Sequence, residues 1–230
     1  MIELLVPFGF YLLTGLMIYS LPVLMKPSKA LFNRKRKTTR YFMYGFVTWF
    51  LYLSGLSNNG FLNNFELPPR LPILVIIPVV FILFWYASRP YLLKTIKTVP
   101  YHYFVYIQSF RVIVELLIWG CFLMGVLPEV VTFEGLNFDI YVGFSALIVG
   151  FLAQQNKISK KGLLIWNWAG IAVLLFTVFQ FVDYYFIGDF EPDKFSGQFV
   201  KLPYLFLPAV LMPLALFYHM VSIRQLNQEN

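Results

Sequence analysis

The sequence predicts an all-α polytopic membrane protein, folded as a bundle of seven transmembrane helices. Of its 230 residues, 59% are hydrophobic and only 13% are charged, whereas a soluble domain carries about 25% charged residues. The mean hydropathy is +0.70, and several apolar runs approach the roughly 20 residues that a helix needs to cross a bilayer. Because the loops between these runs are short, the whole range 1–230 is predicted to form a single transmembrane domain.

Seven apolar runs are the predicted spans. The first begins close to the N-terminus and carries Glu3 where a signal peptide would carry basic residues. No small-residue cleavage pattern follows it, so it is expected to be a retained helix. The approximate ranges of the seven spans are 4–25, 41–57, 72–89, 102–127, 138–155, 163–187 and 203–223.

The distribution of basic residues predicts the orientation of the bundle. Fourteen of the 18 Lys and Arg residues fall in the loops at 26–40, 89–97 and 157–161 or in the C-terminal tail. The seven spans place all of these on one side, and most acidic residues lie on the other. Since loops rich in Lys and Arg stay in the cytoplasm, we expect the N-terminus outside and the C-terminus in the cytoplasm.

The net charge of +7 is explained by this topology. The basic segment 26–40 is predicted to contact anionic lipid headgroups, and nucleic acid is not an expected partner. No cofactor and no metal site are predicted, because Cys121 is the only cysteine and the two histidines, His102 and His219, are isolated. Both histidines are interpreted as interfacial residues, with a bis-histidine haem or metal site as the alternative.

The stretch QSFRVIVE at 108–115 places charges inside the fourth predicted span. Gln108, Arg111 and Glu115 share one helical face, which should point into the bundle and away from lipid. Arg111 and Glu115 lie one turn apart and could neutralise each other, or a neighbouring helix could supply a partner. The functional hypothesis is a proton-coupling or substrate-contacting carboxylate, and the alternative is a clasp that fixes the helices.

Two further polar groups are candidates for the site. Gln180 and Asp183 lie in the outer part of the sixth span and are predicted either to contact a ligand or to meet packing partners and interfacial water. Glu134, Asn137 and Asp139 lie at the start of the fifth span. Asn137 or Asp139 could cap that helix, or the three could form a cation-attracting rim at the outer mouth.

Two segments carry a resemblance to known sequences. QSFRVIVE at 108–115 and TFEGLNFDI at 132–140, followed by Gly143, resemble a pattern of uncharacterised prokaryotic multi-span membrane proteins. The resemblance implies a prokaryotic cytoplasmic (inner) membrane as the location and implies no activity. The number and orientation of the spans are also similar to those of seven-span sugar transporters, although their proline–glutamine signature is absent.

Three functions remain open at the level of sequence. The preferred one is binding or transport of a small solute, a proton or an amphipathic molecule through the polar face of the fourth span. The second is a structural or accessory role with partner subunits in a larger membrane complex. The third is an intramembrane enzyme acting on a lipid or isoprenoid, although nucleotide-binding, metalloprotease and serine-hydrolase motifs are all absent.

Overall fold

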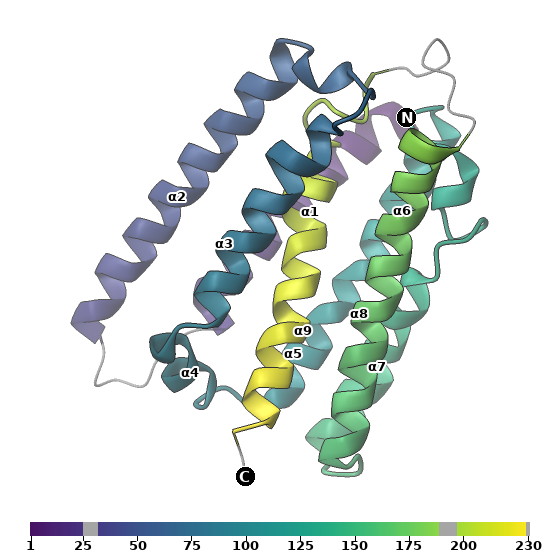
Figure 1. Cartoon of the computed structure of the whole chain (residues 1–230). Helices are drawn as coiled ribbons and strands as arrows, with labels where there is room; N and C mark the ends of the chain where they lie inside the picture. Colours follow the sequence, from purple (N-terminus) through teal and green to yellow (C-terminus); the bar gives the residue numbers. More distant parts are fainter. Residues whose placement is uncertain (25–31, 189–196, 229–230) are drawn as a thin grey trace.

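The computed structural model describes residues 1–24, 32–188 and 197–228, and every regular element in these ranges is helical. The long helices run side by side, with the N-terminus at one end of the bundle and the C-terminus at the other (Figure 1). The predicted all-α class is therefore confirmed. Residues 26–31 of the basic segment 26–40 lie outside the described residues, and so do the side chains of residues 32–39.

The first half of the chain forms two long helices and a third that begins with a π-helical turn. The elements are α1 (Ile2–Leu24), α2 (Phe32–Asn58), the 3-10 turn η2 (Phe61–Asn63), the π-helical η3 (Pro72–Ile76) with α3 (Ile77–Ala87), and the short α4 (Pro90–Ile96).

The second half supplies most of the buried core. Its elements are α5 (Tyr101–Tyr106), the 3-10 turn η4 (Ile107–Ser109), α6 (Phe110–Leu123), the 3-10 turn η5 (Glu129–Val131), α7 (Asp139–Gln154), α8 (Lys160–Val182) with the π-helical η6 (Asp183–Ile187), and the π-helical η8 (Leu207–Leu211) with α9 (Met212–Leu226).

Each of the seven predicted ranges overlaps a helical stretch of the described chain. By length and composition, four stretches of the described chain can cross a membrane: Ile2–Pro22, Tyr101–Leu123, Lys160–Ile187 and Leu207–Leu226. Pro72–Ala87 and Asp139–Gln154 are shorter apolar helices. The short helix α4 was not predicted from the sequence.

The fourth predicted range, 102–127, extends too far. Its helix ends at Leu123 because Gly125 adopts a positive φ of 68°. The amides of Gly125 and Val126 donate to the carbonyls of Phe122 and Cys121, both at 2.8 Å. This pairing is a Schellman motif, which terminates the helix.

Helix α9 forms the centre of the bundle, where Phe217, Tyr218 and Val221 are fully buried. Close packing around it depends on small residues, which let membrane helices approach each other. A Cβ added to Gly143 of α7 would lie 2.8 Å from the backbone nitrogen of Val112 in α6. A Cβ on Gly170 of α8 would overlap the His219 ring of α9.

The three π-helical turns lie together at the end of the bundle that holds the N-terminus (Figure 1). Two of them contain a proline, Pro72 in η3 and Pro208 in η8. Proline has no amide hydrogen to donate and disrupts the regular α-helical ladder, which favours a wider turn at these positions.

Candidate functional site

Helix α6 presents its three polar residues on one buried face. Gln108 is 0% exposed, and Arg111 and Glu115 are each 1% exposed, in agreement with the predicted inward face. Gln108 Nε2 donates to the Ala215 carbonyl of α9 at 3.0 Å, so it ties the two helices together. Arg111 and Glu115 bind elsewhere, and not to each other.

Arg111 forms a two-point ion pair with Asp139, the first residue of α7. Its Nε donates to Asp139 Oδ2 at 2.6 Å, and its Nη2 donates to Asp139 Oδ1. This fork geometry is the strong form of a guanidinium–carboxylate contact. Of the two partners considered for Arg111, Glu115 on its own helix and a group on a neighbouring helix, the structure shows the second, since Asp139 provides the counter-charge.

His219 holds the other side of the guanidinium. Arg111 Nη1 lies 3.0 Å from His219 Nε2, and a guanidinium has donors only, so Nε2 must accept. The ring hydrogen then lies on Nδ1, which donates to Asn167 Oδ1 at 2.9 Å. Asn167 Nδ2 in turn donates to Ser222 Oγ at 3.1 Å and to the Leu163 carbonyl at 2.8 Å.

The interfacial position expected for His219 is wrong, because its side chain is 0% exposed. The interfacial position followed only from the place of His219 near the cytoplasmic end of the last predicted span. The neighbours that other helices supply could not be seen from that count. The available signal was the helical face that His219 shares with Ala215 and Ser222, where small and polar residues recur at helical spacing.

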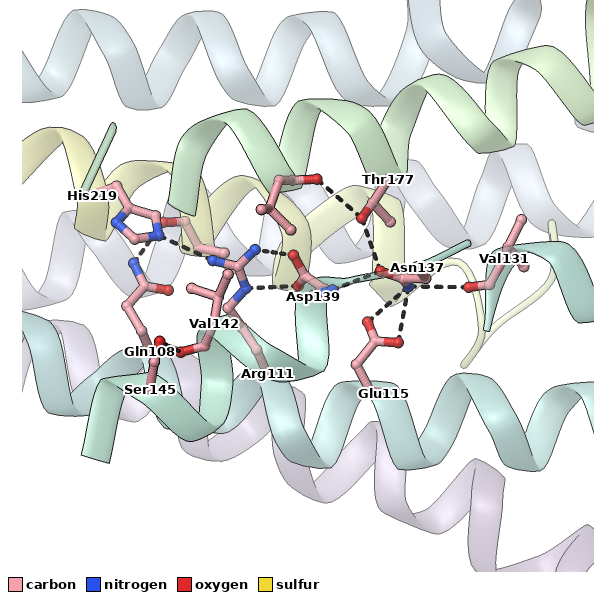
Figure 2. Close-up of polar contacts among 12 residues, drawn as sticks. Gln108, Arg111, Glu115, Val131, Asn137, Asp139, Val142, Ser145, Thr177 and His219 are labelled. Carbon is pink, nitrogen blue, oxygen red and sulfur yellow. Dashed lines mark hydrogen bonds and ion pairs between the residues drawn. The ribbon is translucent and has the colours of Figure 1, made fainter. Parts of the chain in front are cut away.

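Glu115 is held by Asn137. Asn137 Nδ2 lies 2.9 Å from each carboxyl oxygen and also donates to the Val131 carbonyl at 3.0 Å. Asn137 Oδ1 accepts from the Thr177 hydroxyl of α8 at 2.9 Å and from the Asp139 backbone amide at 3.0 Å. Figure 2 shows the contacts as one row from His219 to Val131. Within the described residues, Glu115 has no ion-pair partner.

The structure places two of the three predicted rim residues inside the bundle. Asn137 is 1% and Asp139 is 4% exposed, and only Glu134 is exposed at the surface. The segment after α6 folds back across the bundle end, which carries Asn137 and Asp139 down to the polar face of α6. Neither Asn137 nor Asp139 is the N-cap of α7, which is Phe138 without a side-chain cap hydrogen bond; Asn137 Oδ1 instead accepts from the Asp139 amide in the turn before the helix.

The other two predicted ligand contacts lie apart from this cluster. Gln180 is buried in α8, and Asp183 is partly exposed at the start of η6. In the described part of the chain, no side-chain hydrogen bond links either residue to Arg111 or Glu115. The α8 residue that joins the cluster is Thr177, one turn before Gln180.

A cavity of about 80 Å³ lies beside the cluster. Its lining includes four residues of the cluster, Arg111, Glu115, Asp139 and Thr177, but the surface that they present to the cavity is almost wholly apolar. The remaining lining is almost entirely apolar: Phe65, Leu71, Pro72, Ile76, Phe110, Val114, Ile118, Leu174, Val178, Phe181, Val182, Tyr185, Phe186, Phe199, Leu207, Pro208, Leu211, Met212 and Ala215.

The cavity is not lined by buried residues alone. The lining residues Ile76 on η3 and Val178 and Val182 on α8 are partly exposed, whereas Val114 and Ile118 on α6 are buried. The polar cluster lies beside this almost wholly apolar space. Among the described residues, no group of three or more His, Cys, Asp or Glu side chains is placed to hold a metal ion.

Comparison with known proteins yields one match. A family model described as a domain of unknown function, DUF8737, matches residues 68–227. This range contains every residue of the polar cluster, and it agrees with the predicted membership of an uncharacterised family. No curated protein and no solved structure matches the chain.

Proposed function

We propose that this chain, which belongs to the DUF8737 family of unknown function, is an integral membrane protein that binds an amphipathic molecule in order to transport it. The proposal includes seven spans, with the N-terminus outside and the C-terminus in the cytoplasm of a prokaryotic cell. The basic segment 26–40 then contacts anionic headgroups of the cytoplasmic (inner) membrane.

The observation that supports this function most is an almost wholly apolar cavity directly beside a buried cluster of ionisable side chains. Ionisable groups are expensive in a membrane interior, and where they occur they mark pathways or binding sites. An amphipathic ligand would bury an apolar segment in the cavity and have the ionisable cluster as its nearest polar neighbour. An ordinary packing contact does not need an open space beside a buried carboxyl group.

The dimensions of the cavity define the part of the ligand that it encloses. A cavity of about 80 Å³ has room for about five water molecules if each requires roughly 15 Å³ of such volume. That is the size of a short segment of a ligand and not of a whole lipid. The rest of the ligand would extend past the partly exposed lining residues of η3 and α8 toward the bilayer.

Native mass spectrometry of the chain, extracted with its surrounding lipid, tests this function. We expect a retained amphipathic molecule in the wild type and its loss in Val178→Trp, which fills part of the cavity. The matched control is Leu175→Trp on the same helix, where the side chain is 57% exposed and outside the cavity. Unchanged occupancy in Val178→Trp, or a wild-type chain without any such molecule, would contradict the proposal.

The proposed topology has its own test, made simple by the single cysteine. In a Cys121→Ser background, Glu134→Cys should react with a membrane-impermeant maleimide added to intact cells. Lys157→Cys should react only after the membrane is made permeable. The reverse pattern, or equal labelling of both sites, would overturn the proposed orientation.

Helix α2 favours a second candidate, an accessory role in a larger complex. It stands away from the bundle over much of its length (Figure 1), and Tyr41, Tyr44 and Leu51 are 69%, 60% and 64% exposed. A photo-reactive phenylalanine analogue at position 44 tests this role in native membranes. Crosslinks to one defined protein would support the subunit role, and crosslinks to lipid alone would oppose it.

A further inference from the structure

We propose that the turn between α3 and α4 is a binding site for one anionic phospholipid, whose phosphate group is held by the side chains of Arg89, Lys94 and Lys97. This inference rests on the proposed location in a membrane and is independent of the proposed transport. The site is separate from the cavity, and it is also distinct from the basic segment 26–40.

Helix α4 is amphipathic and lies at the end of the bundle that holds the C-terminus (Figure 1). Leu92 and Ile96 of α4, and Val99 just after it, are buried against the bundle. Lys94 and Lys97 are exposed, and residues three positions apart lie on the same side of a helix. The outer side of α4 therefore presents two neighbouring ammonium groups.

The last turn of α9 holds this region in position. Arg224 donates to the Ser88 carbonyl at 2.9 Å and to the Arg89 carbonyl at 3.2 Å, where α3 ends. Gln225 Nε2 donates to the Ile96 carbonyl at 2.8 Å, at the end of α4. The backbone that carries the three basic side chains is thus fixed to the bundle at both ends of α4. The Arg224 guanidinium also adds a positive charge next to the turn.

The positive charges of the turn have no acidic partner in the described chain. Within the described residues, the side chains of Arg89, Lys94 and Lys97 make no ion pair and no hydrogen bond. The ranges 67–114 and 197–228, which include α3, α4, α5 and α9, contain no Asp or Glu, and Glu229 lies outside the described residues. Because Lys and Arg bind phosphate through charge-assisted hydrogen bonds, a phosphate group is a fitting counter-charge for this turn.

A cation–π contact positions the arginine of the site. The guanidinium carbon of Arg89 lies 3.8 Å from the centroid of the Trp85 ring, one turn earlier in the chain. Stacking on an aromatic ring occupies the face of a guanidinium and leaves the N–H groups at its edge for phosphate oxygens. Tryptophan is enriched where a membrane helix reaches the headgroup level, so Trp85 marks the depth at which Arg89 lies.

The surface of α3 next to the turn favours a lipid over a soluble anion. Phe81, Ile82 and Phe84 are each more than half exposed, and Arg89 follows within two turns of them. An apolar surface therefore meets a cationic one at the end of α3. A phospholipid has hydrocarbon chains for the first and a phosphate for the second, whereas an acidic peptide or a nucleic acid has no partner for the apolar part.

Native mass spectrometry with two matched lipids tests the site. The purified chain in detergent is titrated with dioleoyl phosphatidylglycerol or dioleoyl phosphatidylcholine, which have the same chains and differ in the net charge of the headgroup. We expect one phosphatidylglycerol to bind at least tenfold more tightly than phosphatidylcholine. Glycerol phosphate at the same concentration should not displace it. In nanodiscs, a phosphatidylglycerol analogue with a diazirine in its headgroup should crosslink to the segment 84–97.

Two double variants assign the binding to this turn. Lys94→Gln with Lys97→Gln should weaken phosphatidylglycerol binding by about fivefold for each cation removed, without an effect on phosphatidylcholine. Lys157→Gln with Lys161→Gln removes the same charge from exposed side chains near the start of α8 and should change the affinity less than twofold. Melting temperatures equal to that of the wild type would confirm that both double variants are folded.

Each contrary result overturns a stated part of the inference. Equal affinity for the two lipids, or an equal loss in the two double variants, would overturn the site and leave only a diffuse attraction between charges. Displacement by glycerol phosphate would overturn the assignment to a lipid. The cavity variant Val178→Trp should bind phosphatidylglycerol as the wild type does, so failure of the proposed function and failure of this site are separate outcomes.

Discussion

Arg111 and Glu115 lie one turn apart on the same helix and are equally buried, yet their surroundings differ in kind. Arg111 has a two-point counter-ion in Asp139 and a third contact with His219. Glu115 has an amide from Asn137 and an open cavity beside it, and no ion-pair partner among the described residues. The contrast teaches that burial alone does not tell a balanced charge from an unbalanced one on the same helix, because the neighbouring segments supply the partners.

The two surroundings imply different responses to mutation. Removal of one member of a balanced buried pair leaves the other charge unpaired, so the cost falls on stability. Removal of the unbalanced charge relieves a burial cost, so the effect should fall on binding. Four substitutions, ordered from the largest expected effect on stability to the smallest, test this contrast.

Asp139→Ala should have the largest effect. It leaves the Arg111 guanidinium buried without a counter-charge, which costs about 3–5 kcal/mol, measured as the change in unfolding free energy in detergent. The double variant Arg111→Met with Asp139→Leu should recover most of this loss, because it removes both charges and fills their space. A single variant as stable as the wild type would remove the ion pair from its structural role.

Gly170→Ala should disturb the packing of His219, the residue that contacts Arg111 on the side away from Asp139. Its added methyl group would overlap His219, and overpacking of this kind costs about 1–3 kcal/mol. Gly15→Ala in α1 is the matched control, because a Cβ there meets nothing within 4 Å. Equal melting temperatures for the two variants would contradict the prediction, because they would show that α8 and α9 can accommodate the added methyl group without a loss of stability.

Thr177→Val should have a smaller effect. The substitution keeps the shape of the side chain and removes the hydroxyl that donates to Asn137, so about 0.6 kcal/mol of stability should be lost. Thr14→Val is a control of the same chemistry, because the buried Thr14 hydroxyl has no hydrogen-bond partner within the described chain. A greater loss in Thr14→Val than in Thr177→Val would contradict the role assigned to Thr177.

Glu115→Gln should change stability least, by less than about 0.6 kcal/mol, the average contribution of one hydrogen bond in a membrane. The amide oxygen retains the contact from Asn137, and the burial of an unpaired charge is avoided. Thermal unfolding of the variant and the wild type in detergent, with native mass spectrometry of the bound molecule beside it, provides the comparison. A strongly destabilised Glu115→Gln chain would place this residue with Arg111 as a structural element and would end the distinction between them.

The helical segments could be predicted from the sequence because apolar length and loop charge are local properties. The inward face of Gln108, Arg111 and Glu115 could also be predicted, since helical spacing alone determines it. The end of α6 was placed too late because an apolar run continues through Gly125 to Leu127 and hides the turn at that glycine.

The partners of the polar face could not be predicted, because they come from other segments. Asp139 lies 28 positions and His219 lies 108 positions from Arg111. Asn137 and Asp139 follow a loop with exposed Glu134, so their position favoured a surface role. Only the return of that loop across the bundle end, together with the close approach of α6 and α7 at Gly143, brings them to Arg111 and Glu115.

The three π-helical turns have a mechanical consequence for the cavity. Each contributes to its lining, through Pro72 and Ile76, through Tyr185 and Phe186, and through Leu207, Pro208 and Leu211. A π turn holds one residue more than an α turn, and conversion between the two rotates the rest of the helix by about 100° per residue. The outer part of the cavity is thus lined by three turns of this kind, while the ion pair of Arg111 and Asp139 belongs to α6 and α7. A change of turn type would therefore alter the width of the cavity at one end and leave the ion pair in position.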